Sequence, residues 1–321
     1  MMNIARRFRL HKSTSTIDAA LIVLLLIISV CTNAGYLSGF IPQLDLLIHF
    51  QLQYLIALIL VATCILIRKK FRLLMLSIIL IAIPMSRVVP WYLGSNDTAT
   101  SSNLKIFSAI VKANNYNYHS FIELVNACNP DVLIVIEATS IWQIQLKGLI
   151  DSFPYLLAHE SDGGAGIMLF SKYPMLNKSI HVHSSGMATL TAEISRQQGN
   201  FSIAAVHPIR PGIRHGSRLR DKDLLEISKV LSTITGRLIV IGDLNTTMWS
   251  KGYTKFVKSN NLLNVSKGNG IILTWGKYLK SLLSIPIDHC FTRGDFNVHS
   301  LYAVEISGSN HDGLVFEVHE R

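Results

Sequence analysis

The stretch at residues 236–250, GRLIVIGDLNTTMWS, decides the fold. Its residues 237–241 predict a buried strand, because a short apolar run bounded by glycine is typical of a strand covered on both faces. The chain then breaks at Gly242 and presents Asp243 and Asn245 just past the carboxyl end of the strand, where α/β sheets bind ligands. Side chains at i and i+2 of an extended chain face the same way, so we expect both to face one ligand. The alternative interpretation is a simple Asp/Asn turn.

The chain from residue 104 onwards alternates predicted strands and helices. Strands outnumber helices, and several follow one another directly, so two mixed sheets packed face to face with helices outside fit better than a doubly wound parallel sheet. The predicted strands are 104–111, 131–136, 163–171, 187–194, 201–206, 287–292, 296–304 and 313–319, and the predicted helices are 119–128, 139–151, 217–234 and 253–259.

The front of the chain predicts a membrane anchor. Residues 1–95 hold most of the excess hydrophobicity, with candidate transmembrane helices at 17–36, 44–67 and 71–93. A polar linker follows at 96–103, and the domain 104–321 comes after it. The second candidate helix is weakened by polar residues in its first half, which suit either an intramembrane site or, more simply, contacts between helices or an interfacial position. These residues are Asp45, His49, Gln51 and Gln53.

Basic residues set the expected orientation. One cluster precedes the first candidate helix, and a second, RKKFR at residues 68–72, lies between the second and third. Three spans place both clusters in the cytoplasm, whereas two spans violate the positive-inside rule, so we favour three. A cleaved signal peptide is the competing interpretation of the first segment.

The net charge of +10 is mostly a property of the anchor. Residues 1–95 carry 9 Lys and Arg against 2 Asp and Glu, a difference of +7, which leaves 21 against 18, or +3, for residues 96–321. Charge alone therefore gives no argument for a nucleic-acid partner. Of the four cysteines, Cys128 and Cys290 lie in the second part, and without motif spacing we expect free thiols.

Polar residues flank the predicted strands at five places. A carboxylate such as Glu137 suits a hard divalent cation, an Asp288–His311 pair suits general acid–base work, and amide and imidazole donors suit phosphoryl oxygens. A single histidine after a strand is more often structural, but five such places in one domain indicate phosphoryl chemistry. The residues are Glu137, His207, Asp243 with Asn245, Asp288 with His289, and Asn310 with His311 and Asp312.

Six motifs in this order resemble the endonuclease/exonuclease/phosphatase superfamily: VLIVIEAT, GIMLFSKYP, VHPIRP, IGDLNTTMWS, IPIDHCF and GSNHDGLVFEV. The resemblance covers residues 103–319, and the three-span front end is similar to membrane-anchored bacterial members. It implies a four-layer α/β sandwich, here preceded by the three predicted transmembrane helices. With the orientation expected from the basic clusters, we expect a bacterial inner-membrane protein with a cytoplasmic N-terminus and a periplasmic or extracellular C-terminal domain. The resemblance also implies attack of water on a phosphoester with Mg²⁺ or Mn²⁺.

The resemblance assigns roles by position. The catalytic histidine is His311, paired with Asp288, and the residue that positions or activates water is Asp243. The remaining roles are Glu137 and Asn310 for the metal, Asn245 and His207 for the scissile phosphate, and, as weaker candidates, Arg210 and Arg214 for substrate phosphates.

Two positions depart from the family pattern. Ile110 stands where the first strand normally ends in a metal-site Asn, and only a loop that curls back would let Asn114 or Asn115 compensate. Asn310 stands where an Asp normally precedes the histidine, which removes one charge from the metal site. These departures support an alternative hypothesis, a degenerate domain that binds a phosphate ligand or partner without turnover. The substrate also stays open between nucleic acid and phospholipid, since the short linker keeps the domain near the lipid bilayer.

Overall fold

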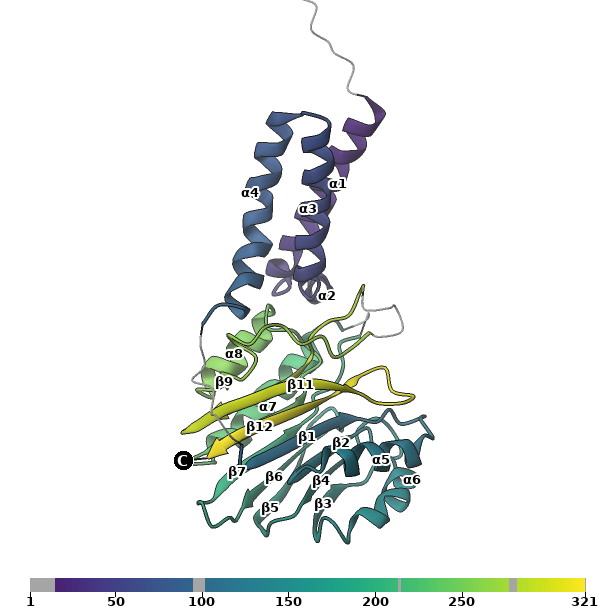
Figure 1. The fold of residues 1–321 in the computed structure, drawn as a ribbon, viewed down its shortest axis with the longest axis vertical. Coiled ribbons are helices and arrows are strands. Elements are labelled where there is room, and N and C mark those ends of the chain that lie inside the picture. Colours follow the sequence, from purple (N-terminus) through teal and green to yellow (C-terminus); the bar gives the residue numbers. More distant parts are fainter. Residues whose placement is uncertain (1–14, 95–101, 213–214, 277–281, 321) are drawn as a thin grey trace, which may run out of the picture.

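The computed structural model describes residues 15–94, 102–212, 215–276 and 282–320. Residues 96–101, most of the predicted linker 96–103, lie outside them. Figure 1 shows an elongated molecule with a bundle of apolar helices at one end and a sandwich of two sheets at the other. Their arrangement confirms the predicted class, an α/β sandwich preceded by membrane-type helices.

Both sheets are mixed and six-stranded, in the orders β11-β12-β1-β2-β4-β3 and β5-β6-β7-β8-β10-β9. The first contains a parallel β1–β2 pair and the second a parallel β7–β8 pair, while the other pairings are antiparallel. The strands are β1 (Leu104–Ile110), β2 (Val132–Ile136), β3 (Tyr155–His159), β4 (Ile167–Ser171), β5 (Met175–Val182), β6 (Ala188–Ile194), β7 (Phe201–Val206), β8 (Leu238–Asp243), β9 (Leu263–Asn264), β10 (Asp288–Arg293), β11 (Phe296–Glu305) and β12 (Asp312–Glu320).

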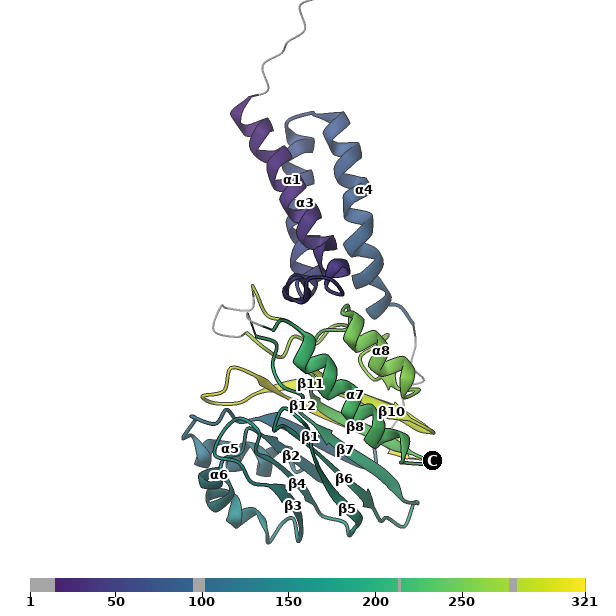
Figure 2. The same cartoon turned by 180° about the vertical axis from the view of Figure 1, so that it is seen from behind.

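Strand β8 is apolar on both faces, and this property dictates the layers. Side chains alternate along a strand, so Ile239 and Ile241 enter the core between the two sheets. Leu238 and Val240 instead face the outer helices α7 (Arg218–Ser232) and α8 (Lys251–Ser259). Strand β2 divides in the same way between the central core and the helices α5 (Tyr118–Cys128) and α6 (Ser140–Gln145). The result is four layers, helix, sheet, sheet and helix (Figures 1 and 2).

Helix α6 is shorter than the predicted helix 139–151. Thr139 caps it, since the Thr139 hydroxyl accepts a hydrogen bond from the Trp142 amide at 3.4 Å. After Gln145 the chain tightens into a 3₁₀ turn, Leu146–Leu149, which includes the poor helix former Gly148. That turn buries Leu146 and Leu149 against the first sheet.

Three strands escape prediction: β3, β5 and β9. Each is the last strand at one edge of its sheet, and β9 has only two residues. Edge strands have only one neighbour and bury less, so their apolar pattern is weak: most of β5 is exposed or half-buried. These three edge strands therefore lack the apolar pattern by which buried strands are predicted.

The bundle consists of α1 (Thr16–Ala34), α3 (Gln51–Ile67) and α4 (Phe71–Val88), packed around Leu25, Leu58 and Ile65. By length and apolarity, two segments qualify as membrane spans, Thr16–Leu37 and Phe71–Trp91. The second predicted span, 44–67, is bent: Pro42–Ile48, which includes α2 (Asp45–Ile48), meets Gln51–Ile67 at 60°.

The polar residues of the bent segment make contacts between elements. The Gln51 side chain donates to the Thr32 carbonyl at 3.2 Å and accepts from Arg87 at 2.7 Å. The Gln53 amide reaches across to the sandwich, where it donates to the Ser284 carbonyl at 2.6 Å. Contacts with neighbouring elements, the simpler of the two interpretations, therefore account for these two residues.

The second basic cluster, at residues 68–72, lies beside the start of α1, and the first cluster falls outside the described residues. Asp18, at the start of α1, accepts from Arg68 at 2.7 Å and lies 2.6 Å from the Lys70 ammonium, in the turn between α3 and α4. This turn and the start of α1 are at the end of the bundle remote from the sandwich (Figure 1). Any membrane crossed by the bundle would separate that end from the sandwich.

Gly242 permits the close approach of β8 to β7, and we predict that Gly242→Ala destabilises the protein. Its φ is +147°, and an added Cβ would lie 2.0 Å from the Val206 carbonyl oxygen. We expect a loss of about 3 kcal/mol in unfolding free energy, measured by denaturant titration of the full chain in mild detergent. The control is Gly148→Ala, where a Cβ would meet nothing within 4 Å. Equal midpoints for the two variants would contradict this account.

Candidate active site

The polar strand ends predicted from the sequence meet at one edge of the sandwich. Strands β7 and β8 run parallel and end there, and the antiparallel β10 begins beside β8 with Asp288 opposite Asp243. In the other sheet, β1 and β2 end at this edge while β12 begins there, just after His311. Carboxyl ends of parallel strands share an edge, so residues distant in sequence converge. Glu137, His207, Asp243, Asn245, Asn310 and His311 line one cavity at this edge.

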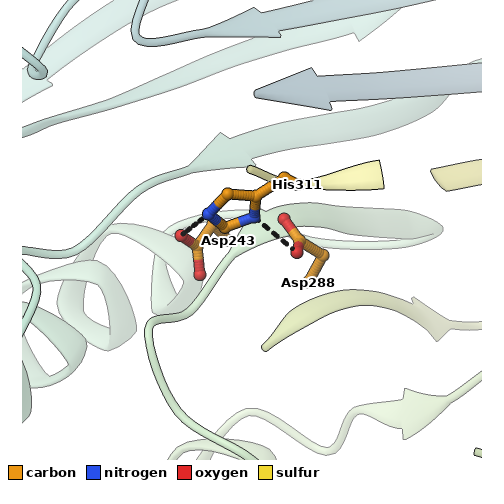
Figure 3. A group of neighbouring side chains, drawn as sticks. All are labelled: Asp243, Asp288 and His311. Carbon is orange, nitrogen blue, oxygen red and sulfur yellow. Dashed lines mark hydrogen bonds and ion pairs between the residues drawn. The ribbon is translucent and has the colours of Figure 1, made fainter. Parts of the chain in front are cut away.

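His311 lies between two aspartates (Figure 3). Its Nδ1 is 2.9 Å from Asp288 Oδ2, a hydrogen bond, and its Nε2 is 3.9 Å from Asp243 Oδ2. The His311 backbone is held by Ser309, whose hydroxyl accepts from the His311 amide at 3.0 Å and donates to the Ile110 carbonyl at 2.6 Å. The imidazole is thus oriented by one carboxylate and directs its other nitrogen towards the cavity.

Charge is concentrated around this imidazole. Burial favours its neutral form, but the hydrogen-bonded Asp288 carboxylate, with Asp243 and Glu137, raises the pKa of His311 to about 9. Burial, together with the Asp288 carboxylate, raises the pKa of Asp243 well above its usual value. Burial and the nearby His311 charge lower the pKa of His207 to about 4. At neutral pH the site therefore holds one charged and one neutral imidazole.

Asp243 is fixed by its own turn. Its Oδ1 accepts from the Asn245 amide at 2.6 Å, and Asn245 adopts a left-handed φ of 50°. The chain therefore turns after Asp243 instead of continuing extended as the i, i+2 expectation assumed, and both residues nevertheless line one cavity. The Asn245 side-chain NH₂ donates to the Pro208 carbonyl at 3.0 Å, which ties this turn to the segment after His207.

Glu137 follows β2 in a left-handed conformation, with φ 59°. Its Oε2 accepts from the Ala113 amide at 3.2 Å, and an added Cβ on Gly164 would lie 3.6 Å from its Oε1. The glutamate thus enters the cavity from the first sheet, opposite the aspartates of the second.

The residues present fit a divalent cation. Ligand atoms of Asp243, Asp288 and His311 lie within 4.8 Å of one another, and Glu137 faces the same cavity. Carboxylate oxygens are the ligands that Mg²⁺ and Mn²⁺ prefer. Asp288 Oδ1 is buried without a hydrogen-bond partner among the described residues, so one buried carboxylate oxygen stays available.

The segment that joins α1 to α3 of the helical bundle forms part of the same site. The cavity has a volume of about 810 Å³, and Leu46, His49 and Phe50 line it beside the sandwich residues. His49 Nδ1 lies 3.0 Å from the Thr247 hydroxyl, in the turn that follows Asp243. Its Nε2 lies 3.5 Å from Asp45, one helical turn earlier. The sequence did not predict that this segment lines the cavity. The signal it offered was the presence of polar residues inside an otherwise apolar segment.

A buried ion pair fixes the segment around α2 to the sandwich. Arg220, fully buried on α7, donates from Nη1 to Asp45 at 2.7 Å and to the Asn245 carbonyl at 3.4 Å. The other two guanidinium nitrogens, Nε and Nη2, donate to Asp221 at 3.0 and 2.7 Å. One arginine therefore connects the segment around α2, helix α7 and the turn that holds Asp243.

Some predicted residues take no part in the cavity lining. His289 points to the other face of β10, where its Nε2 bonds to the Thr246 carbonyl at 2.8 Å and its ring packs against Tyr253. Ile110 lies in the central core, and Asn115 is occupied by the Val111 and Ser307 carbonyls, so it does not replace the missing polar group. Arg210 lines the cavity, and Arg214 is outside the described residues.

The family model of the endonuclease/exonuclease/phosphatase family matches residues 101–311, more than half of the chain. The chain belongs to this family. No curated protein matches the sequence.

Cys128 and Cys290 are free cysteines in the structure, in agreement with the free thiols that the sequence predicts.

Solved structures share the fold at low sequence identity. TDP2 from D. rerio, complexed with a single-strand DNA product, is 15% identical with a TM-score of 0.57, over 67% of this chain and 98% of that one. A beta toxin mutant from Staphylococcus aureus with bound magnesium ions is 17% identical with a TM-score of 0.53, over 68% and 100%. A functionally unknown protein from Enterococcus faecalis is 15% identical with a TM-score of 0.55, over 68% and 100%. In all three comparisons nearly the whole other chain is covered.

We predict that Asp45→Ala destabilises the full chain by about 2–3 kcal/mol. The substitution leaves the buried Arg220 guanidinium with only Asp221 as its acidic partner, and an uncompensated buried charge is costly. Thermal unfolding in mild detergent measures the effect. Asp221→Ala is the matched control, because its carboxylate is 41% exposed and should contribute under about 1 kcal/mol. A larger loss in the control would refute the assigned order.

Proposed function

We propose that this protein is a membrane-anchored, divalent-metal-dependent phosphoesterase that hydrolyses a phosphodiester with a His–Asp pair. Membership of a hydrolytic family supports the reaction class. The observation behind the assignment is the buried His311 imidazole, bonded to Asp288 and 3.9 Å from Asp243, at a cavity that Glu137 also lines.

His311 and Asp243 divide the proton chemistry in this proposal. Asp288 holds the Nδ1 proton of His311, which directs Nε2–H towards the phosphoryl group or its leaving oxygen. Asp243, whose pKa is raised, accepts hydrogen bonds from the attacking water and takes up its proton. His207 and Asn245 bind phosphoryl oxygens from the second sheet, and the burial of His311, Asp243 and His207 strengthens their interactions.

Glu137 and Asn310 hold the divalent cation in this proposal, from the first sheet and from the turn before β12. When bound, the cation supplies positive charge to the phosphoryl oxygens. Asn310 offers a neutral oxygen where the family pattern has a carboxylate, so the site has one negative charge fewer. We expect this loss to lower metal affinity.

The proposed location is a bacterial inner membrane, with the N-terminus in the cytoplasm and the sandwich outside. The second basic cluster, in the turn between α3 and α4, lies at the end of the bundle remote from the sandwich, as the positive-inside rule requires for this orientation. Nucleic acid is one substrate class, since the related D. rerio TDP2 is complexed with a DNA product. Phospholipid is the other.

A degenerate, non-hydrolytic domain is the second candidate function. Two observations favour it: Ile110 is packed in the core where a polar group is expected, and Asn310 replaces a carboxylate. The two functions differ in whether the site binds a divalent cation and turns over a phosphodiester.

His311→Ala should abolish hydrolysis of a generic aryl phosphodiester by the full chain in detergent, with Mg²⁺ or Mn²⁺ present. We expect a fall of about 10³-fold in kcat, since the variant loses the acid–base group. The matched control is His119→Ala, because the His119 side chain is 87% exposed on α5 and should leave turnover unchanged. Full activity in His311→Ala would eliminate the proposed mechanism.

Metal binding gives a test that is independent of turnover. We predict that the full chain binds Mn²⁺ in calorimetric titration, that Glu137→Gln weakens binding about tenfold or more, and that Asn310→Asp strengthens it, because the first removes and the second adds a carboxylate. Glu123→Gln, on the exposed face of α5, is the control. If the wild-type chain binds no Mn²⁺ at millimolar concentrations while Asn310→Asp binds it, the degenerate domain is the better account.

A further inference from the structure

The cavity has two chemically different sides. One is the carboxylate and imidazole group around Asp243 and His311. The other is apolar and comes partly from the sandwich, through residues that include Trp275, Ile285 and Ile287, and partly from the anchor, through Leu46 and Phe50. A phosphate group is bound by polar and charged side chains. The apolar side of the cavity therefore indicates the chemistry of the rest of the substrate.

The anchor side of the wall is held rigidly. Leu46 and Phe50 each follow one of the polar residues Asp45 and His49 in the chain, and both line the cavity. Their neighbours Asp45 and His49 are bonded to Arg220 and Thr247 of the sandwich.

The start of the segment is equally close to the sandwich. An added Cβ on Gly216 would lie 2.4 Å from the Pro42 carbonyl carbon, and the Ser217 amide donates to the Pro42 carbonyl at 3.4 Å. The segment is therefore fixed against the sandwich at Pro42, Asp45 and His49. Its apolar side chains have defined positions in the cavity.

This wall is continuous with the apolar surface of the bundle. Phe50 immediately precedes α3, whose outer face exposes Ile56, Ile59 and Leu60 by 49%, 48% and 61%. On the other side of α2, Phe40 is 85% exposed. Surface of this kind belongs in lipid rather than in water. The catalytic cavity thus borders the region where the bundle would meet a bilayer.

We infer that Leu46 and Phe50 form an apolar subsite for the alkyl part of an amphiphilic phosphoester drawn from the bilayer, with its phosphate at His311 and Asp243. This inference rests on the proposed function and specifies its substrate class. A nucleic-acid strand carries charge on every linkage and presents no alkyl group to this wall, so the wall favours a lipid. The anchor thereby acts in substrate selection as well as in tethering.

The test compares two substrates that differ only in chain length, 4-nitrophenyl methyl phosphate and 4-nitrophenyl dodecyl phosphate, with the full chain in one detergent. We expect kcat/KM to be at least about tenfold higher for the dodecyl ester, and Leu46→Ala and Phe50→Ala each to reduce that ratio severalfold. Leu47→Ala, on the same segment but outside the cavity lining, is the control and should keep the ratio. Equal ratios in all four proteins would overturn the inference, as would preferred cleavage of plasmid DNA that the two substitutions leave unchanged.

A binding measurement separates this inference from the proposed function. Trp275 lines the cavity, so 11-bromoundecyl phosphate bound there should quench its fluorescence, isolated by subtracting the Trp275→Phe signal. We expect saturable quenching that weakens at least fivefold in the Leu46→Ala/Phe50→Ala double variant and not in Leu47→Ala. Such quenching without any ester hydrolysis would support the subsite while contradicting the enzyme. Quenching identical in the double variant would overturn the subsite whatever the turnover.

Discussion

The structure depends on one constraint: strand β8 is apolar on both faces and must be covered on both. Ile239 and Ile241 require a second sheet, and Leu238 and Val240 require helices α7 and α8. Once both demands are met, the strand has only its end through which to present polar groups. Asp243 occupies that end, and the pairing of β10 with β8 brings Asp288 opposite it. The position of the site is thus a result of how the core is buried.

This arrangement places carboxylates close together, and their repulsion destabilises the ionised forms. Burial and the Asp288 carboxylate destabilise the ionised form of Asp243, while the same carboxylates stabilise a protonated His311. A group of acids that is unfavourable by itself is a suitable place for cations, whether an imidazolium or a divalent metal ion. The electrostatic cost of the folded state and the proposed chemistry therefore have one origin.

Much of this architecture was predictable because it depends on local pattern. Apolar runs such as those of β2 and β8 specify buried strands, and polar residues at their ends specify the edge where Glu137, Asp243 and His311 meet. Edge strands such as β5 lacked that pattern. The left-handed turn at Asn245 was also hidden, since the residue type allows either an extended or a turn conformation.

The contacts between the α2 segment and the sandwich could not be predicted from the sequence, for a different reason. Asp45 and His49 pair with Arg220 and Thr247, residues some 175 and 198 positions away, and no local pattern reports a contact of that separation. In the sequence these two residues appear only as defects in an apolar segment. The structure shows them to be the polar connection between two parts of the chain.

The contact of Pro42–Ile48 with the sandwich limits where the chain can be truncated without changing the site. A truncation that starts after the last bundle helix, as sequence alone would suggest for soluble expression, would deprive the fully buried Arg220 of Asp45 and open the cavity on one side. Such a fragment would retain every residue of the family pattern and still differ from the intact protein in charge balance and in the shape of its site. The functional unit of this chain therefore extends into its helical bundle.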